Sequence, residues 1–123
     1  MKRLPDTELE VMKALWATGP DTPRTLLEEQ LSPFGWAANT INTYLARLAD
    51  KGFVAVRREG KSNRYTPLVD QETYQAFDSR AVLDRLYGSP RNFVAALARE
   101  GMRRGELEEL QALLDQLNGG QGQ

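Results

Sequence analysis

WAANTINTYLARLADKG (residues 36–52), followed directly by FVAVRREGKSNRYTP (residues 53–67), decides the fold because the spacing of its apolar residues changes at Gly52. In the first part, the large apolar side chains share one face at helical spacing. These are Ile41, Tyr44, Leu45 and Leu48. The pattern predicts a helix over residues 38–51, which Gly52 ends as a left-handed cap.

The opposite face of this predicted helix is polar. It carries Asn39, Thr43, Ala46 and Asp50, flanked by Asn42 and Arg47. Short amides and hydroxyls at the start of a helix can read base edges in a major groove about 12 Å wide, where asparagine pairs with adenine and threonine contacts the thymine methyl. We therefore predict base contacts from one set of side chains. The set is Asn39, Thr40, Asn42, Thr43 and Arg47.

Alternatives for this face stay open at the level of sequence. The face could simply be solvated, since a fold does not imply a function. Arg47 could pack its stem along the helix and meet a local carboxylate. Asp50 argues against DNA on this side, because a carboxylate repels phosphate.

Residues 53–67 predict a β-hairpin with basic residues at and beside its tip. Residues 53–58 favour one strand, residues 59–62 a turn, and residues 63–66 the returning strand. Cations on such a hairpin can hold phosphates without reading sequence. The cations are Arg57, Arg58, Lys61 and Arg64. The alternative is an ordinary edge hairpin, which lysine and arginine commonly protect.

Two further helices are predicted before this stretch. Residues 7–16 have apolar positions at helical spacing, and Thr7 with Glu10 fits a capping box. Residues 23–31 form the second helix, for which Thr22 is the expected N-cap. Three helices followed by a basic hairpin are the element order of a winged helix-turn-helix, so the predicted fold is mainly α with a small β-hairpin.

The predicted domains are a winged-helix DNA-binding domain over residues 1–67 and a helical dimerisation domain over residues 68–123. Such a protein would bind double-stranded operator DNA as a homodimer. The competing hypothesis is a winged helix that docks another protein through its third helix and hairpin, without specific DNA binding. DNA binding weakens steeply as salt rises, whereas apolar docking does not.

Dimerisation is predicted from the leucines of the last helix, whose spacings of three and four form a coiled-coil-like seam. Burying each leucine stabilises by about 1.5–3 kcal/mol, so we expect a second copy of the chain to pack against this seam. The predicted dimerisation residues are Tyr74, Phe77, Leu83, Leu86, Phe93, Leu107, Leu110, Leu114 and Leu117. The alternative is that the seam folds back within the monomer. Residues 118–123 are expected to form a frayed polar tail.

Composition limits the possible chemistry. The 123 residues contain no cysteine and no histidine, so disulfides, thiolate nucleophiles, imidazole chemistry and the common soft-metal ligands are excluded. Composition leaves carboxylate-only catalysis open, but the adjacent pairs Glu28-Glu29 and Glu108-Glu109 point about 100° apart on a helix instead of converging on a substrate. We therefore predict no metal, no cofactor and no enzyme. The net charge is −1, but residues 36–67 carry 6 Lys/Arg against 2 Asp/Glu. No apolar run approaches the roughly 20 residues that span a bilayer, and no secretory signal begins the chain. We expect a cytoplasmic protein without membrane insertion.

The sequence resembles a known family of bacterial regulators, the penicillinase and methicillin-resistance repressors BlaI and MecI and the related CopY regulators. The resemblance covers residues 4–117. It is strongest in LPDTELEVMKALW (residues 4–16), in residues 36–52 and in EGKSNRYTP (residues 59–67). It implies an N-terminal winged helix and a C-terminal helical dimerisation domain that represses from palindromic operators.

The resemblance also implies a route of induction. In the β-lactam branch of the family, a membrane sensor metalloprotease leads to cleavage of the repressor at an Asn-Phe bond in the C-terminal domain. Asn92-Phe93 stands at the matching place in GSPRNFVAAL (residues 88–97). The alternative for this pair is that Phe93 simply packs in a dimer core.

The chain departs from the family pattern in three places. Ala37-Ala38-Asn39 replaces a better-capped and often more basic start of the recognition helix, and Asp50 stands where lysine is common. Both departures bear on the operator sequence and on affinity. The cysteine cluster of the copper-sensing branch is absent, so copper sensing through thiolates is excluded.

Overall fold

The structure is a computed structural model that describes residues 1–121. The chain divides into two compact units, Met1–Ala81 and Val82–Gln123. We call them the N-terminal unit and the C-terminal unit. Within residues 1–121, none of the helices is both long and apolar enough to cross a membrane.

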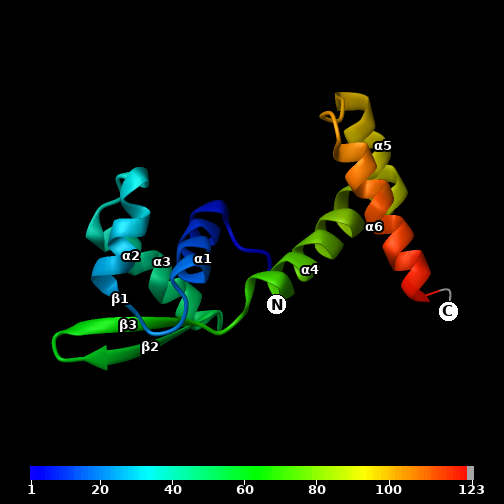
Figure 1. The fold of residues 1–123 in the computed structure, drawn as a ribbon. Helices are drawn as coiled ribbons and strands as arrows, with labels where there is room; N and C mark the ends of the chain where they lie inside the picture. The colour runs from blue at the N-terminus through cyan, green and yellow to red at the C-terminus, as the bar shows by residue number, and fades with distance from the viewer. Residues whose placement is uncertain (122–123) are drawn as a thin grey trace. The chain divides into compact units, whose positions relative to one another are not determined.

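The N-terminal unit combines helices with a small antiparallel sheet. The helices are α1 (Asp6–Thr18), α2 (Arg24–Leu31), α3 (Ala38–Asp50) and α4 (Gln71–Val82), with a 3₁₀ turn at Ser32–Phe34 after α2. The strands are β1 (Thr22–Pro23), β2 (Val54–Glu59) and β3 (Ser62–Pro67), in the spatial order β1-β3-β2. Helices α1, α2 and α3 gather on one side of the sheet, and the β2–β3 hairpin extends past them (Figure 1).

One apolar core holds these elements together. Its fully buried side chains come from the facing sides of α1, α2 and α3, and the hairpin closes it with Phe53, Val54 and Tyr65. The core members with no more than 1% exposure are Val11, Met12, Leu15, Leu27, Leu31 and Leu48. Because each such side chain stabilises the fold by about 1.5–3 kcal/mol, the core fixes the orientation of α3.

The central prediction is confirmed almost residue for residue. Helix α3 ends at Asp50, and Gly52 follows in the left-handed region with φ 82°. The hairpin pairs Glu59 with Ser62 across a two-residue turn, and Gly60 has φ 61°. A positive φ at the first turn position is what a type II′ hairpin requires, and glycine supplies it without strain.

Both predicted N-terminal helix caps are wrong. Helix α1 begins at Asp6 without a side-chain cap, so Thr7 and Glu10 form no capping box. Thr22 lies in β1, opposite Tyr65, and its hydroxyl donates to the carbonyl of Gly19 at 2.8 Å. The sequence did not predict β1, because two residues are too short for a strand period to be visible.

Helix α4 packs on the N-terminal core, so the structure divides after Ala81 and not after Pro67. Tyr74 is 3% exposed, and its ring centroid lies 5.8 Å from that of Phe53 and 6.0 Å from that of Trp16. Its hydroxyl accepts a hydrogen bond of 2.7 Å from the backbone N–H of Leu4. Aromatic contacts and a satisfied hydroxyl attach α4 to this unit.

The C-terminal unit contains a π-helical turn (Leu83–Tyr87) and the helices α5 (Pro90–Glu100) and α6 (Glu106–Gln121). Ser89 caps α5, because its hydroxyl accepts from the backbone N–H of Asn92 at 3.1 Å. Helix α6 continues through Asn118 to Gln121, so a polar tail does not begin at Asn118. Residues 122 and 123 of the predicted tail lie outside the described residues.

An ion pair between a partly exposed lysine and a buried glutamate joins α1 to the end of α3. Glu8 is 2% exposed in the core, and the Lys51 Nζ lies 2.5 Å from its Oε1. Replacing Lys51 with methionine leaves the carboxylate buried without its partner, which costs about 1–3 kcal/mol. We expect the unfolding midpoint to fall by roughly 4–8 °C for each kcal/mol lost. Thermal unfolding followed by circular dichroism measures the change.

Lys13→Met is the matched control for this prediction. Lys13 pairs with Glu10 at 3.3 Å on the surface of the same helix, where an ion pair contributes about 0–1 kcal/mol. An equal fall of the unfolding midpoint in both variants would show that the Glu8–Lys51 pair stabilises the fold no more than a surface pair does.

Candidate nucleic-acid interface

The predicted base-reading residues lie on the outer face of α3, opposite its buried residues Ile41, Leu45 and Leu48. The exposed members are Asn39, Asn42, Thr43 and Arg47. Thr40 is half-buried, and the Thr43 hydroxyl donates to the carbonyl of Asn39 at 3.0 Å within the helix. Among the described residues, Arg47 forms no ion pair, so the local carboxylate that sequence left open as its partner is not observed.

A groove runs between α3 and the hairpin. It has a volume of about 340 Å³. Asn42, Leu45, Ala46 and Ala49 line it from α3, and Val56, Asn63 and Tyr65 line it from the strands. The groove therefore joins one edge of the exposed face of α3, at Asn42 and Ala46, to the inner face of the hairpin.

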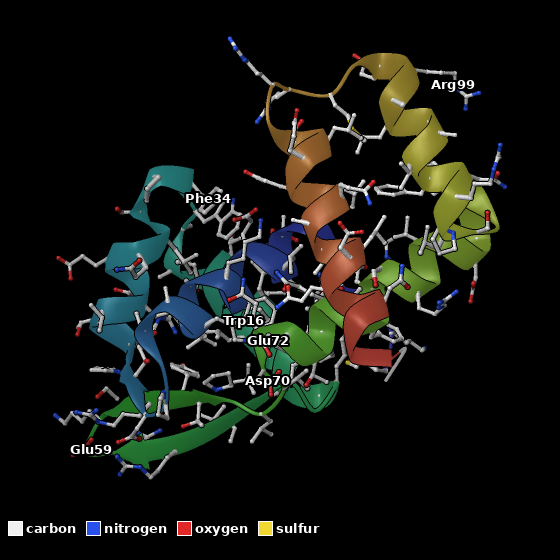
Figure 2. All side chains as sticks on the ribbon, turned by 45° about the vertical axis from the view of Figure 1, so that its right-hand side comes forward. Trp16, Phe34, Glu59, Asp70, Glu72 and Arg99 are labelled. Atoms are coloured by element: carbon white, nitrogen blue, oxygen red, sulfur yellow. The ribbon has the colours of Figure 1, made fainter. Side chains whose placement is uncertain are left out.

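The register of the hairpin places the four cations predicted to hold phosphates at different sites on it. Residues that pair across antiparallel strands share a face, and that face alternates along each strand. Arg58 pairs with Asn63 and lies on the face that Val56 and Tyr65 turn toward α3. Arg57 pairs with Arg64 on the opposite face. Lys61 is exposed in the turn beside Glu59, which Figure 2 labels at the outer end of the hairpin.

Arg57 and Arg64 are held in an ion-pair network with acidic residues. The Arg57 guanidinium donates to both carboxylate oxygens of Asp21, at 2.9–3.1 Å. Arg64 donates to the Asp21 carbonyl at 2.9 Å and to the carboxylate of Glu59. Among residues 1–121, Arg58 and Lys61 form no ion pair. Of the four basic residues predicted on the hairpin, Arg58 and Lys61 are therefore the two without an ion-pair partner in the described part of the chain.

The ion pairs shift the pKa values of Asp21 and Arg57 in this network. The hydrogen bond from Arg57, with smaller charge effects of Arg57 and Arg64, lowers the pKa of Asp21 below its ordinary 3.8. The same hydrogen bond raises the pKa of the Arg57 guanidinium above its ordinary value. Asp21 has φ 54°, a left-handed conformation that aspartate and asparagine tolerate better than most residues.

The lowered pKa of Asp21 predicts a pH dependence. A carboxyl whose folded pKa is depressed stabilises the fold above its unfolded pKa, and this contribution is lost as pH falls through the folded pKa. Asp21→Asn keeps the left-handed backbone but removes the charge. We expect wild type to be more stable than this variant at pH 7, and the difference to shrink below about pH 4. Urea unfolding at pH 7 and pH 2.5 checks this, and a pH-independent difference would contradict it.

Two residues of the interface were missed at the level of sequence. Asn63 lines the groove from β3, and Arg24 at the start of α2 donates to the Asn42 Oδ1 at 2.5 Å. Asn63 would have been found by continuing the strand alternation from Arg58 across the turn. Arg24 carried no local signal, because its partner stands 18 positions further along the chain.

A profile of the penicillinase repressor family matches residues 4–116. The chain belongs to the penicillinase repressor family. This family member is 31% identical to the penicillinase repressor of Bacillus licheniformis over 121 residues, which covers 94% of both proteins. It is 26% identical to the methicillin resistance regulatory protein MecI of Staphylococcus aureus over 110 residues, covering 88% of this chain and 89% of MecI.

A solved structure supports the same assignment for the N-terminal unit. The solution structure of the DNA-binding domain of the repressor BlaI matches with a TM-score of 0.51 and 36% identity. The match covers 60% of this chain and 94% of that domain. The predicted fold class, a winged helix within a mainly helical chain, is confirmed.

The residues predicted to form the dimerisation surface of this penicillinase repressor family member fall into three groups. Tyr74 and Phe77 pack in the N-terminal core, with ring centroids 6.1 Å apart, so we leave them out of that surface. Leu83 and Leu110 are half-buried in the C-terminal unit. The remaining side chains are 40–71% exposed. They are Leu86, Phe93, Leu107, Leu114 and Leu117.

Asn92 and Phe93 lie in the first turn of α5. The Asn92 side-chain amide donates to the carbonyl of Tyr87 at 2.8 Å. The Phe93 ring contacts that of Tyr87 edge to face at 5.1 Å. The peptide bond between them is therefore part of a capped helix.

Proposed function

We propose that this chain is a transcriptional repressor that binds palindromic operator DNA as a homodimer and acts in the cytoplasm, where bacterial DNA lies. The observation that carries the proposal is the groove between α3 and the inner face of the hairpin. Arg58 lies on that same face of the hairpin. Helix α3 would enter the major groove, and the hairpin would rest on the phosphate backbone. The family assignment supports the same function.

The proposed division of work on DNA follows from the side chains. Asn39, Asn42, Thr43 and Arg47 would contact base edges, and Arg58 with Lys61 would hold phosphates. The half-buried Thr40 would support the helix from its side. Arg57 and Arg64 would hold the hairpin in place through Asp21 and Glu59.

The exposed leucines of α6 support the proposed homodimer. Leu107, Leu114 and Leu117 are 47–60% exposed along one helix. A two-fold pairing buries the same face of each copy and presents two α3 helices to two operator half-sites. Because the two copies are linked, binding of one half-site raises the effective concentration of the second copy at the other half-site.

We also propose that induction proceeds by cleavage between Asn92 and Phe93 by a membrane sensor metalloprotease, as the family resemblance implies. Because proteases bind extended chain, the first turn of α5 would have to unwind before cleavage, breaking the Ser89 cap. Cleavage there would separate α6 from the winged helix and end bivalent binding. Unchanged induction in the native host after Asn92→Ala or Phe93→Ala would exclude this route.

The proposed function is tested by fluorescence anisotropy with DNA from upstream of the protein's own gene, titrated across a salt series. Operator binding is expected to be tight, to involve two copies per site, and to weaken steeply with salt as counterions are released. Binding no tighter than to random DNA would refute an operator in that region. Salt-independent capture of a protein partner would instead support the docking alternative, which the exposed Asp50 on α3 favours.

The two faces of the hairpin predict different effects on this titration. Arg58→Ala removes a cation on the α3 side, so we expect uniform weakening on all sequences and a salt slope shallower by about one. Arg57→Ala is the matched control, because Arg57 already neutralises Asp21 on the far face. Its salt slope is expected to stay close to that of wild type. The opposite ranking would place the phosphate contacts on the far face.

A further inference from the structure

Arg24 contacts four residues of the N-terminal unit, on three elements, around the start of α3. Its Nη1 donates to the Asn42 Oδ1 at 2.5 Å and to the Tyr65 hydroxyl at 3.4 Å. Its Nη2 donates to the carbonyl of Ala38 at 3.3 Å. The Oε1 of Glu28 lies 2.9 Å from Nε, which pairs the charges although the N–H is not aligned for a hydrogen bond.

This arrangement immobilises the guanidinium. The Arg24 side chain is 16% exposed, and its planar fork meets α2, α3 and β3 at once. A guanidinium that is already fixed by several contacts loses little side-chain freedom when it makes one more hydrogen bond. The group that accepts this hydrogen bond is therefore also held in place. That group is the side-chain amide of Asn42, an exposed residue of α3 that lines the groove facing the hairpin.

The hydrogen bond decides which end of the amide is available. An asparagine amide has one acceptor oxygen and one NH₂ donor group. Arg24 has donors only, so it selects Oδ1. Within residues 1–121, the Asn42 Nδ2 makes no hydrogen bond, and it remains the free end of the side chain.

We propose that Arg24 is a positioning residue for sequence readout, which fixes the Asn42 amide so that its NH₂ group reads a hydrogen-bond acceptor on a base. This inference rests on the proposed DNA binding. In the major groove the acceptors are N7 of either purine, O6 of guanine and O4 of thymine. Base preference at this position therefore depends on a residue of α2 that does not itself contact the base.

The first test uses the full-length protein and an operator series in which each base pair is replaced in turn. Asn42→Ala identifies the base pair at which discrimination depends on this amide. Arg24→Gln is expected to reduce discrimination at that same pair by about 3- to 10-fold, the effect of one hydrogen bond. The double variant is expected to discriminate no worse there than Asn42→Ala alone.

Three further variants separate positioning from charge and from stability. Arg24→Lys keeps the charge without the fork, and we expect it to lose discrimination as Arg24→Gln does. Glu28→Gln removes the ion pair but leaves the hydrogen bonds to α3, so discrimination should persist. Asn42→Asp keeps an oxygen for Arg24 but has no donor, so preference should move to a base donor, N4 of cytosine or N6 of adenine. A uniform loss of affinity in Arg24→Gln, with an unchanged base profile, would overturn the inference.

A measurement on the free protein distinguishes failure of this inference from failure of the proposed function. The side-chain NH₂ resonances of Asn42 in a nitrogen–proton correlation spectrum should shift in Arg24→Gln and stay in place in Glu28→Gln. If wild type binds no operator but these shifts occur, the positioning contact stands and the proposed function fails. If the resonances do not move, Arg24 does not hold the amide, whatever the protein binds.

Discussion

Replacing Leu114 with lysine is expected to weaken operator binding by about 10²- to 10⁴-fold, the range over which linked sites exceed single ones. Leu114 is 47% exposed on α6, beside a groove between α5 and α6 that Val94, Ala98 and Leu110 also line. A charge in the middle of an apolar two-fold interface would be buried twice without a partner. The variant should therefore sediment as a monomer at micromolar concentration, and anisotropy should report single half-site binding.

Gln116→Lys is the matched control for this substitution. It adds the same charge to the same helix, but two positions along an α-helix is a rotation of about 200°, which places it on the other side. Helix content and the unfolding midpoint of each variant are read by circular dichroism, so that loss of folding is told apart from loss of pairing. A Leu114→Lys protein that remains dimeric would show that the leucine face of α6 is not the interface.

Tyr74→Ala is expected to destabilise the N-terminal unit by about 3–5 kcal/mol, as removal of a large buried aromatic does. The ring lies between Trp16, Phe53 and Phe77, and the Leu4 N–H loses its acceptor. Because a domain of this size has a total stability of about 5–15 kcal/mol, much of that margin disappears. Urea unfolding followed by tryptophan fluorescence measures the loss, with Trp16 as a reporter beside the site.

Two comparisons make this result specific to the core position of Tyr74. Tyr74→Phe keeps the ring and removes only the hydroxyl, so it should cost about 1 kcal/mol. Tyr87→Ala removes a half-buried tyrosine from the C-terminal unit and should leave the unfolding of the winged helix unchanged. If Tyr74→Ala instead shifted the monomer–dimer equilibrium without changing stability, the residue would belong to the dimer surface after all.

Sequence predicted the elements whose signals are local. Helix α3 and the β2–β3 hairpin follow from a change in apolar period at Gly52, and each position is read from neighbours two to four residues away. The exposed polar face of α3 also followed directly, because once the buried stripe is known, helical geometry assigns the opposite side. Family membership also followed from local motifs in residues 4–16, 36–52 and 59–67.

Tertiary structure decided what depends on segments far apart in the chain. Arg57 and Arg58 are adjacent and chemically identical in sequence, yet they differ because Asp21, 36 positions before Arg57, reaches only one face of the hairpin. Tyr74 fits a helical stripe equally well in either unit, and its place is set by its contacts with Trp16, Phe53 and the Leu4 amide. Periodicity predicts which side of an element is buried, but only the packed structure shows what lies against that side. The reason is that contact energies depend on the shapes of the elements and the distances between them, which the local pattern does not encode.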